Sequence, residues 1–305
     1  MKLCISGANG FVGRTVTRDF RADGAQVVAL VRSGTAAGEV EIGDLSIPGP
    51  APSLPPCDVL IHLAALNSGI DDVDEQALRR FRAVNVEGTR RLLAAAITAG
   101  VGHVVFVSSV KVNGTDTAPG QAFRETDVPV PADAYAVSKM EAEGVVQSLC
   151  DRAGIAWTIV RPPLVYGEGV GGNMRQLARL AHVPLPLPLG GLRNSRSLLY
   201  VGNLSAFLRR VAADPRAHGQ IYLVRDDHDV TTSELIDRIA RAAGREARLF
   251  AVPAFAMAVI RKMRPSIVRR LTESLQIDDT KARRSLQWVP PFSLDDAISR
   301  SFGTP

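Results

Sequence analysis

The stretch Lys2-Leu-Cys-Ile-Ser-Gly7-Ala-Asn-Gly10-Phe-Val-Gly13 opens the chain and decides its fold. Residues 2–6 are an apolar run of strand length, and the pattern of residues 11–21 favours a helix. The three glycines between and at the start of these segments have the spacing GxxGxxG. The first permits a tight turn, the second lets the backbone approach a pyrophosphate, and the third allows close packing of helix on strand. Free N–H groups at the helix N-terminus complete a site for an anion.

The rest of the first half repeats this alternation of strand and helix. The order predicts a parallel sheet with helices on both faces. The predicted strands are 26–31, 58–63, 104–108 and 155–161, and the predicted helical stretches are 74–99 and 134–152.

After residue 162 the pattern changes. Residues 167–172 hold four glycines and residues 184–191 are PLPLPLGG, so both segments predict loops rather than sheet. Strand-like runs return at 197–201 and 220–224, and a helix is predicted at 232–243. We infer a nucleotide-binding domain over 1–165, re-entered at about 197–225. A smaller domain for the substrate takes 166–196 and 226–305, and the proline-rich residues 48–56 predict a surface loop.

Composition excludes several classes of protein. Hydrophobic residues are 46% and charged residues 22% of the 305, which is typical of a folded globular chain. The net charge of +5 (36 basic minus 31 acidic) comes with only 5% aromatic residues and no nucleic-acid-binding motif, so no nucleic-acid partner is expected. Three widely spaced cysteines predict neither a disulfide framework nor a metal site. With no apolar run of 18 residues and a strand beginning at residue 2, we expect a cytoplasmic protein.

The end of the second strand bears on the choice of cofactor. An acidic residue there normally binds the ribose 2′-hydroxyl of NAD. This strand ends Ala-Leu-Val31-Arg32-Ser33, without an acid. Because a guanidinium suits phosphate geometry, Arg32 favours NADP(H) slightly over NAD(H).

Tyr135-Ala-Val-Ser-Lys139 is the second strong signal. A tyrosine and a lysine four residues apart lie on one face of a helix. A phenol is a poor base near neutral pH, but a nearby ammonium and an oxidised nicotinamide both favour the phenolate. Tyr135 is then a candidate to exchange a proton with an alcohol while a hydride moves. Ser109, which follows the strand 104–108, is placed to hydrogen-bond the same oxygen.

Further motifs are spread over nearly the full length of the chain: Asp44 in GDL, His62-Leu-Ala-Ala65, Asn85 in VNVEGT, Ser108-Ser109 and Arg161-Pro162. With the glycine loop and YAVSK, they resemble the extended short-chain dehydrogenases. More narrowly, they resemble the nucleotide-sugar 4-epimerases and 4-keto-sugar reductases of bacterial polysaccharide pathways. Such an enzyme has a Rossmann-type, doubly wound parallel sheet and a smaller, mostly helical C-terminal substrate domain, and a homodimer through the stretches near 80–99 and 134–152 is expected by the same resemblance.

The resemblance also implies roles for individual residues. Asp44 is expected near adenine, Ala64 and Ala65 along the cofactor cleft, Asn85 as its brace, and Lys139 on the nicotinamide ribose. The catalytic residues are Ser109, Tyr135 and Lys139. The expected cofactor-binding residues are Gly7, Asn9, Gly10, Phe11, Val12, Gly13, Arg32, Asp44, Leu45, Leu63, Ala64, Ala65, Asn85, Tyr135, Lys139 and Pro162.

The substrate implied is a nucleotide-diphosphate sugar. Arg196 matches a family arginine that holds the diphosphate, and Asn173 matches a second contact to it. Lys111 and Asn113, in SSVKVNG, are expected to face the sugar. A basic cluster at 261–270 beside the apolar run 249–260 also allows contact with anionic lipid, although a solvated helix face is the favoured interpretation.

Three reactions differ in what they require of these residues. Related 4,6-dehydratases carry an Asp-Glu pair directly after the catalytic hydroxyl residue, whereas Ser109 is followed by Val110-Lys111, so dehydration is excluded. A 4-epimerase and a 4-ketoreductase use the same trio, and we favour the epimerase slightly. A non-catalytic NADP(H) sensor is a remote alternative, because it has no need of Ser109, Tyr135 and Lys139.

Overall fold

The computed structural model describes residues 1–34, 36–67, 75–251, 262 and 265–303. Its centre is a seven-stranded sheet in the order β10-β6-β5-β4-β1-β2-β3, with every pair parallel. The chain therefore reverses its direction of travel across the sheet between β1 and β4, where a Rossmann sheet binds its ligand. The strands are β1 Lys2–Ser6, β2 Gln26–Val31, β3 Glu39–Glu41, β4 Val59–His62, β5 His103–Val107, β6 Ala156–Arg161 and β10 Gln220–Leu223.

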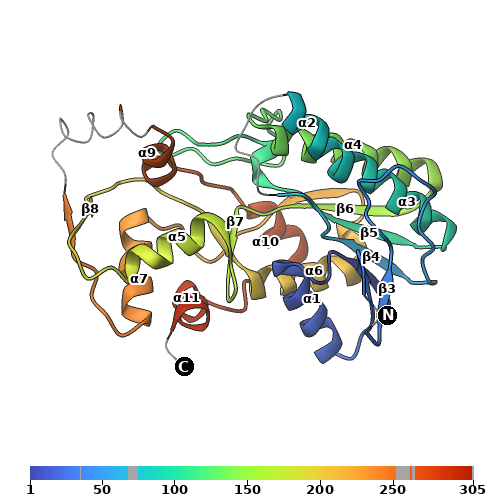
Figure 1. The fold of residues 1–305 in the computed structure, drawn as a ribbon, viewed down its shortest axis with the longest axis horizontal. Helices are drawn as coiled ribbons and strands as arrows, with labels where there is room; N and C mark the ends of the chain where they lie inside the picture. Colours follow the sequence, from blue (N-terminus) through green and yellow to red (C-terminus); the bar gives the residue numbers. More distant parts are fainter. Residues whose placement is uncertain (35, 68–74, 252–261, 263–264, 304–305) are drawn as a thin grey trace.

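Helices cover both faces of this sheet (Figure 1). Side chains alternate along β1, so Leu3 and Ile5 belong to the core on one face and Cys4 to the core on the other. The predicted doubly wound sheet is confirmed. One face packs against α1 Phe11–Ala22, α6 Val201–Ala213 and α10 Thr280–Leu286, and the other against α3 Gly88–Thr98 and α4 Ala134–Ala153, with α2 Glu75–Arg82 against α4.

The predicted helical stretch 74–99 contains an irregularity. Between α2 and α3 the residues Ala83–Glu87 form a π-helical turn, with helical backbone angles on either side. A π-turn inside an α-helix inserts an extra residue and is frequent at functional sites. Here it carries the buried Asn85.

The C-terminal elements build a second core beside the sheet (Figure 1). The helix predicted from 232 is α7, and Thr231 caps it through a capping box with Glu234. These elements are β7 Leu164–Tyr166, α5 Gly172–Ala181, β8 Leu187–Gly190, β9 Leu198–Tyr200, α7 Thr232–Ala242, β11 Leu249–Ala251, α9 Pro265–Thr272 and α11 Leu294–Phe302.

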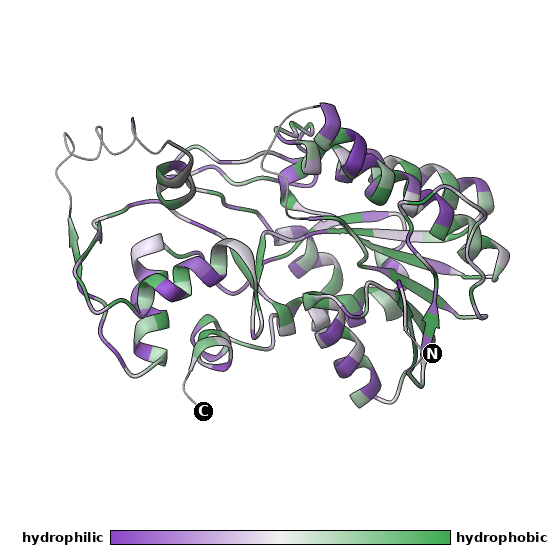
Figure 2. Cartoon of the chain, in the orientation of Figure 1, coloured by the Kyte–Doolittle hydropathy of each residue, from purple (hydrophilic) through white to green (hydrophobic). Residues whose placement is uncertain are grey.

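One prediction for this part was wrong. Within the expected loop 184–191, residues 187–190 form β8, which pairs with β11. The strand-like run 197–201 supplies β9, which pairs with β7 in a separate two-stranded sheet. Figure 2 shows the strands of the main sheet largely green and the helices around them striped with purple. No helix in the described part of the chain is long and apolar enough to cross a membrane.

Candidate active site

The glycine loop between β1 and α1 is shaped to receive a pyrophosphate. Gly7 has φ +70°, and its carbonyl oxygen accepts a hydrogen bond from the N–H of Gly10 at 2.9 Å. A Cβ on Gly13 would lie 2.0 Å from the Gly7 oxygen, and a Cβ on Gly7 would lie 2.7 Å from the nitrogen of Ala64. Only glycine fits both positions. Gly10 caps α1 without a side-chain bond, which leaves the first N–H groups of the helix for an anion. The residues present therefore fit a dinucleotide.

A buried hydrogen-bond chain ties the ends of β1 and β4 together beneath this loop. Ser6 Oγ lies 2.7 Å from His62 Nδ1 and accepts from the N–H groups of Leu63 and Ala64 at 3.2 and 3.3 Å. His62 Nε2 lies 2.9 Å from Thr89 Oγ1, whose hydroxyl donates to the carbonyl of Asn85 at 2.6 Å. Burial lowers the pKa of His62 to about 3, and the charge of Lys139 acts in the same direction. His62 is thus a neutral structural residue, with Nε2 as the donor.

Asn85 clamps the loop after β4 to the helix α4. Its Oδ1 accepts from the N–H of Leu66 at 2.8 Å, and its Nδ2 donates to the Leu66 carbonyl at 3.0 Å and to Ser138 Oγ at 2.9 Å. Ser138 in turn donates to the carbonyl of Tyr135 at 2.7 Å. The π-turn is the local distortion that turns Asn85 into this position. Its role as a brace for the cofactor stays a prediction.

Ser109, Tyr135 and Lys139 come from two elements at the carboxyl edge of the sheet. Ser109 follows β5 and has extended backbone angles, and Tyr135 and Lys139 lie one turn apart on α4. Lys139 Nζ donates to the carbonyl of Val107 at 2.8 Å and lies 4.0 Å from the centre of the Phe106 ring. Burial lowers the pKa of Lys139 to about 7, while Glu143 opposes the change.

The phenol of Tyr135 behaves differently from expectation. Burial raises its pKa to about 12, a hydrogen bond with Ser109 opposes the rise, and the charge of Asp133 adds to it. Lys139 is not among the causes of this shift, and burial lowers its own pKa to about 7. A positive charge close to the phenol favours the phenolate, and an oxidised nicotinamide would supply one.

Asn113 lies deeper than predicted. It is 2% exposed, and its Nδ2 donates to the carbonyl of Arg124 at 2.9 Å. Its Oδ1 accepts from Arg161 at 3.0 Å, and Arg161 also forms a two-pronged ion pair with Glu143 at 2.7 and 2.9 Å. Sequence reasoning missed this buried pair, which fixes the middle of α4 against the end of β6. With both ends of the Asn113 amide bound inside the protein, a contact to sugar stays a prediction.

The residues expected around adenosine surround the end of β2. The Arg32 side chain is 76% exposed, and its Nε lies 3.9 Å from Asp44 Oδ2. Ser46 donates to Asp44 through its N–H at 2.8 Å and its hydroxyl at 2.7 Å, which lowers the pKa of that carboxyl. Leu45 is buried, Leu63 and Ala64 are half-buried and Ala65 is exposed. Of the others, Asn9 is exposed, Phe11 and Val12 are half-buried and Pro162 is buried.

Of the two side chains expected at the diphosphate, the structure describes that of Arg196 and not that of Asn173. Arg196 is half-buried, its Nη1 donates to the carbonyl of Glu273 at 3.3 Å, and burial lowers its pKa. Asn173 lies in the first turn of α5, but its side chain is outside what the structure describes. Arg261, Arg264 and most of the apolar run 249–260 also lie outside the described residues.

Sequence reasoning also missed Asp226, which joins the two cores. Its carboxylate is fully buried and accepts from Tyr166 Oη at 2.8 Å, from the N–H of Tyr200 at 2.9 Å and from Asn203 Nδ2 at 2.7 Å. Burial raises its pKa to about 6. The one signal in the sequence is an acid placed three residues beyond a parallel strand, and its partners lie 23 to 60 residues away.

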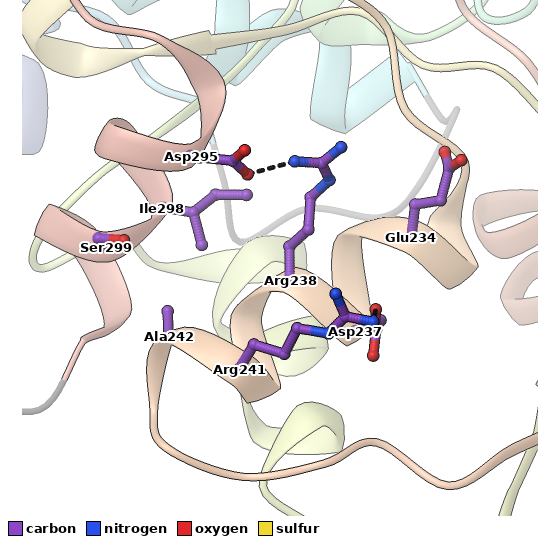
Figure 3. A pocket seen from close by; sticks show the side chains of 8 residues that line it. All are labelled: Glu234, Asp237, Arg238, Arg241, Ala242, Asp295, Ile298 and Ser299. Atoms are coloured by element: carbon purple, nitrogen blue, oxygen red, sulfur yellow. Dashed lines mark hydrogen bonds and ion pairs between the residues drawn. The ribbon is translucent and has the colours of Figure 1, made fainter.

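A hollow between α7 and α11 is separate from this site (Figure 3). Arg238 and Asp295 form an ion pair across it, and Arg241 pairs with Asp237 along α7. Its charges are thus largely paired within the wall. None of the predicted site residues lines it.

The fold and this set of residues define an enzyme of the extended short-chain dehydrogenase type. The family model described as "NAD dependent epimerase/dehydratase family" matches residues 3–224, and the chain belongs to that family. It is an NAD(P)-dependent enzyme, as the resemblance implied.

Three similar proteins illustrate the range of the family. The UDP-glucose 4-epimerase of Vibrio cholerae is 33% identical over 98% of this chain and 94% of its own length. The 2-alkyl-3-oxoalkanoate reductase of Stenotrophomonas maltophilia is 26% identical over 98% of both chains. The crystal structure of Thermus thermophilus UDP-glucose 4-epimerase in complex with NAD has a TM-score of 0.76 at 22% identity, covering 99% of this chain and 98% of the other.

Proposed function

We propose that the protein is a nucleotide-sugar 4-epimerase that interconverts UDP- or dTDP-hexoses differing at C4. The observation that carries the proposal is the set of Ser109, Tyr135 and Lys139 at the carboxyl edge of β5, beside a loop shaped for a dinucleotide. Val110-Lys111 stands where a dehydratase requires two acids. The similarity to an epimerase from Vibrio cholerae over nearly the full length supports the same reaction.

The chain's own residues hold the substrate oxygen and move its proton. A nicotinamide held at the glycine loop would supply the acceptor and donor for the hydride at C4 of the sugar. Tyr135 accepts the C4 hydroxyl proton as the hydride leaves and gives it back in the second half. Ser109 donates a hydrogen bond to the same oxygen. Lys139 donates to the Val107 carbonyl and would hold the nicotinamide ribose through its other N–H groups.

We propose NADP(H) as the favoured form of the cofactor. Arg32 is exposed at the end of β2 and is only loosely paired with Asp44 at 3.9 Å. A hollow next to Asn9, lined by Arg14, Arg18 and Arg21, adds positive charge on the same side of the glycine loop. A guanidinium–phosphate bond stabilises a complex by about 1.5–3 kcal/mol. Arg32→Ala is therefore expected to weaken binding of 2′,5′-ADP about 10–100-fold with little change for 5′-ADP, as calorimetry would measure.

The second candidate is a 4-ketoreductase, which the full-length similarity to a reductase favours. It needs the same three catalytic residues but releases its coenzyme after each turnover. The proposed epimerase is expected to retain its coenzyme through the reaction.

One experiment separates the two functions. The purified protein is denatured and the released nucleotide identified, and native protein is incubated with UDP- and dTDP-hexoses without added coenzyme. Bound coenzyme and interconversion of C4 epimers by chromatography establish the epimerase. A protein free of coenzyme, inert alone, that consumes NADPH or NADH only with a 4-keto-sugar establishes the reductase.

A further inference from the structure

Lys111 contacts both parts of the catalytic set. Its backbone N–H donates to Ser109 Oγ at 3.2 Å. Its ammonium donates to Asp133 Oδ2 at 2.7 Å and lies 5.7 Å from the centre of the Tyr135 ring. One residue therefore joins the turn after β5, which carries Ser109, to the start of α4, which carries Tyr135.

The two carboxylate oxygens of Asp133 have different partners. It is the N-cap of α4, and its Oδ1 accepts from the N–H of Ala136 at 2.7 Å. The other oxygen, Oδ2, holds the ammonium of Lys111. A capping carboxylate fixes the first turn of a helix, and Tyr135 lies in that turn. Pairing with Lys111 also offsets the negative charge that Asp133 places two residues before the phenol.

Among the described residues, the neighbours of Tyr135 on other elements are mainly apolar or neutral. From α2, Phe81 packs edge-on at 5.9 Å between ring centres, with the apolar Ala77 and Leu78 beside it. Ser109 is neutral. Lys139, one turn along α4, is a further charged group; its ammonium donates to the Val107 carbonyl, and burial lowers its pKa to about 7. Burial is the main cause that raises the pKa of Tyr135, and among charged groups Asp133 raises it further.

We propose that Lys111 is a positioning residue for Tyr135, which holds the Ser109 turn against the cap of α4 and offsets the charge of Asp133. The proposal rests on the proposed catalytic role of Tyr135. It differs from the predicted role of Lys111 as a contact to the sugar, because the ammonium is bound within the protein.

Variants of Lys111 and Asp133 are therefore expected to shift the pKa of Tyr135 in opposite directions. Lys111→Met removes a positive charge and leaves Asp133 unbalanced, so it raises the pKa of Tyr135. Asp133→Asn keeps a good cap and removes the negative charge, so it lowers that pKa. For a unit charge about 6 Å away, with an effective dielectric constant between that of a protein surface and that of water, each shift is expected to be about 0.5 to 2 pH units. The double variant is expected to lie near the parent protein.

The first test reads the phenol directly and does not depend on turnover. The full-length protein is labelled with 3-fluorotyrosine, since ring fluorine brings phenol titration into a range the fold survives. The chain has four tyrosines, and Tyr135→Phe assigns the relevant ¹⁹F signal. Arg79→Met, which breaks an exposed ion pair with Glu75 on α2, is the control and is expected to leave the signal unmoved. Shifts of equal sign in the two variants, or no shift in either, overturn the proposal.

The second test separates positioning from sugar binding. As a positioning residue, Lys111→Met is expected to lower kcat about tenfold, to move the acid limb of the kcat/KM profile upward, and to leave KM within about twofold, while Lys111→Arg restores kcat. A rise in KM with unchanged kcat and an unmoved Tyr135 signal shows sugar contact and overturns it. If the protein proves inactive on every nucleotide sugar, the ¹⁹F titration still decides the electrostatic claim, so the two failures are distinguishable.

Discussion

The parallel sheet and the C-terminal elements build their cores in different ways. In the sheet, each strand pairs with a neighbour through a register of three to five residues, and β1, for example, contributes the fully buried Leu3, Cys4 and Ile5 to the cores on both faces. The C-terminal core collects short pieces from three distant stretches, and β8 meets β11 across about sixty residues of sequence. Pairings in the main sheet also span up to about sixty residues. The difference is that each of the predicted strands there has its own apolar pattern, whereas the sequence of β8 indicates a loop.

The largest effect should come from the site at the edge of the sheet. Tyr135→Phe removes one hydroxyl from a half-buried side chain and keeps its contact with Phe81. We expect kcat to fall by about 10²–10⁴, because the proton transfer is lost, while coenzyme content and thermal stability stay within error. Stopped assays of epimerisation alongside calorimetric unfolding would check this. Turnover within tenfold of the parent would remove Tyr135 from the mechanism.

The next prediction concerns the close packing of α1 on the glycine loop, and it compares two glycines that lie in helices. Gly13→Ala places a methyl group 2.0 Å from the Gly7 oxygen, which the backbone must move to relieve. We expect a loss of about 2–3 kcal/mol in unfolding free energy and loss of bound dinucleotide. Gly144→Ala on α4 is the control: nothing lies within 4 Å of its new Cβ, and a gain of about 0.5–1 kcal/mol is expected. Equal stability of the two variants in urea titrations would contradict the close packing of α1 on the loop.

Sequence alone placed the glycine loop and the start of the helix that carries Tyr135 and Lys139 nearly residue by residue. β1, β2 and the start of α4 fall where expected, because the information lies in adjacent residues: glycine spacing, apolar runs, and a tyrosine and lysine one turn apart. β8 was missed because the prolines in residues 184–188 indicate a loop and its partner β11 is remote in sequence.

The polar partners were harder to predict than the elements. Asn113 was expected at the sugar, yet its amide binds Arg161, 48 residues away. Glu143 and Asp226 were not singled out at all. Their buried carboxylates bind residues that are distant in sequence and are brought close only by the fold. A spacing motif cannot reveal such a partner, because no rule relates the separation of two such residues along the chain to their contact in the fold.

The hydrogen-bond chain between β1 and β4 should make the sheet region sensitive to acid. The folded-state pKa of His62 is about 3, below its ordinary value of 6.5, because burial disfavours the charged ring. Its contribution to stability is therefore fully present above about pH 6.5 and is lost as the pH falls toward 3. Between pH 6.5 and 4.5 the loss is roughly 2 kcal/mol, from about 1.4 kcal/mol per pH unit once the unfolded histidine is protonated.

Variants of two histidines isolate this contribution. His62→Asn cannot titrate, so its unfolding free energy should fall less steeply over pH 6.5–4.5 than that of the parent. The exposed His182 provides the control, and His182→Asn should keep the parental slope. Chemical denaturation at five pH values gives the slopes. Parallel curves for the parent and His62→Asn would mean that the ring does not reach the buried neutral state in the folded protein.

The smallest effect is expected in the C-terminal region, at the hollow between α7 and α11 (Figure 3). Arg238 spans it to reach Asp295, whose side chain is 72% exposed. Because water screens such a pair, Arg238→Ala should cost less than about 1 kcal/mol, and a high-salt buffer should remove most of that difference. Turnover should be unchanged, since no predicted site residue lines the hollow. A loss of several kcal/mol, or a fall in kcat, would show that α7 and α11 are held by this contact rather than by their apolar faces. In that case the C-terminal region would depend on a single surface pair.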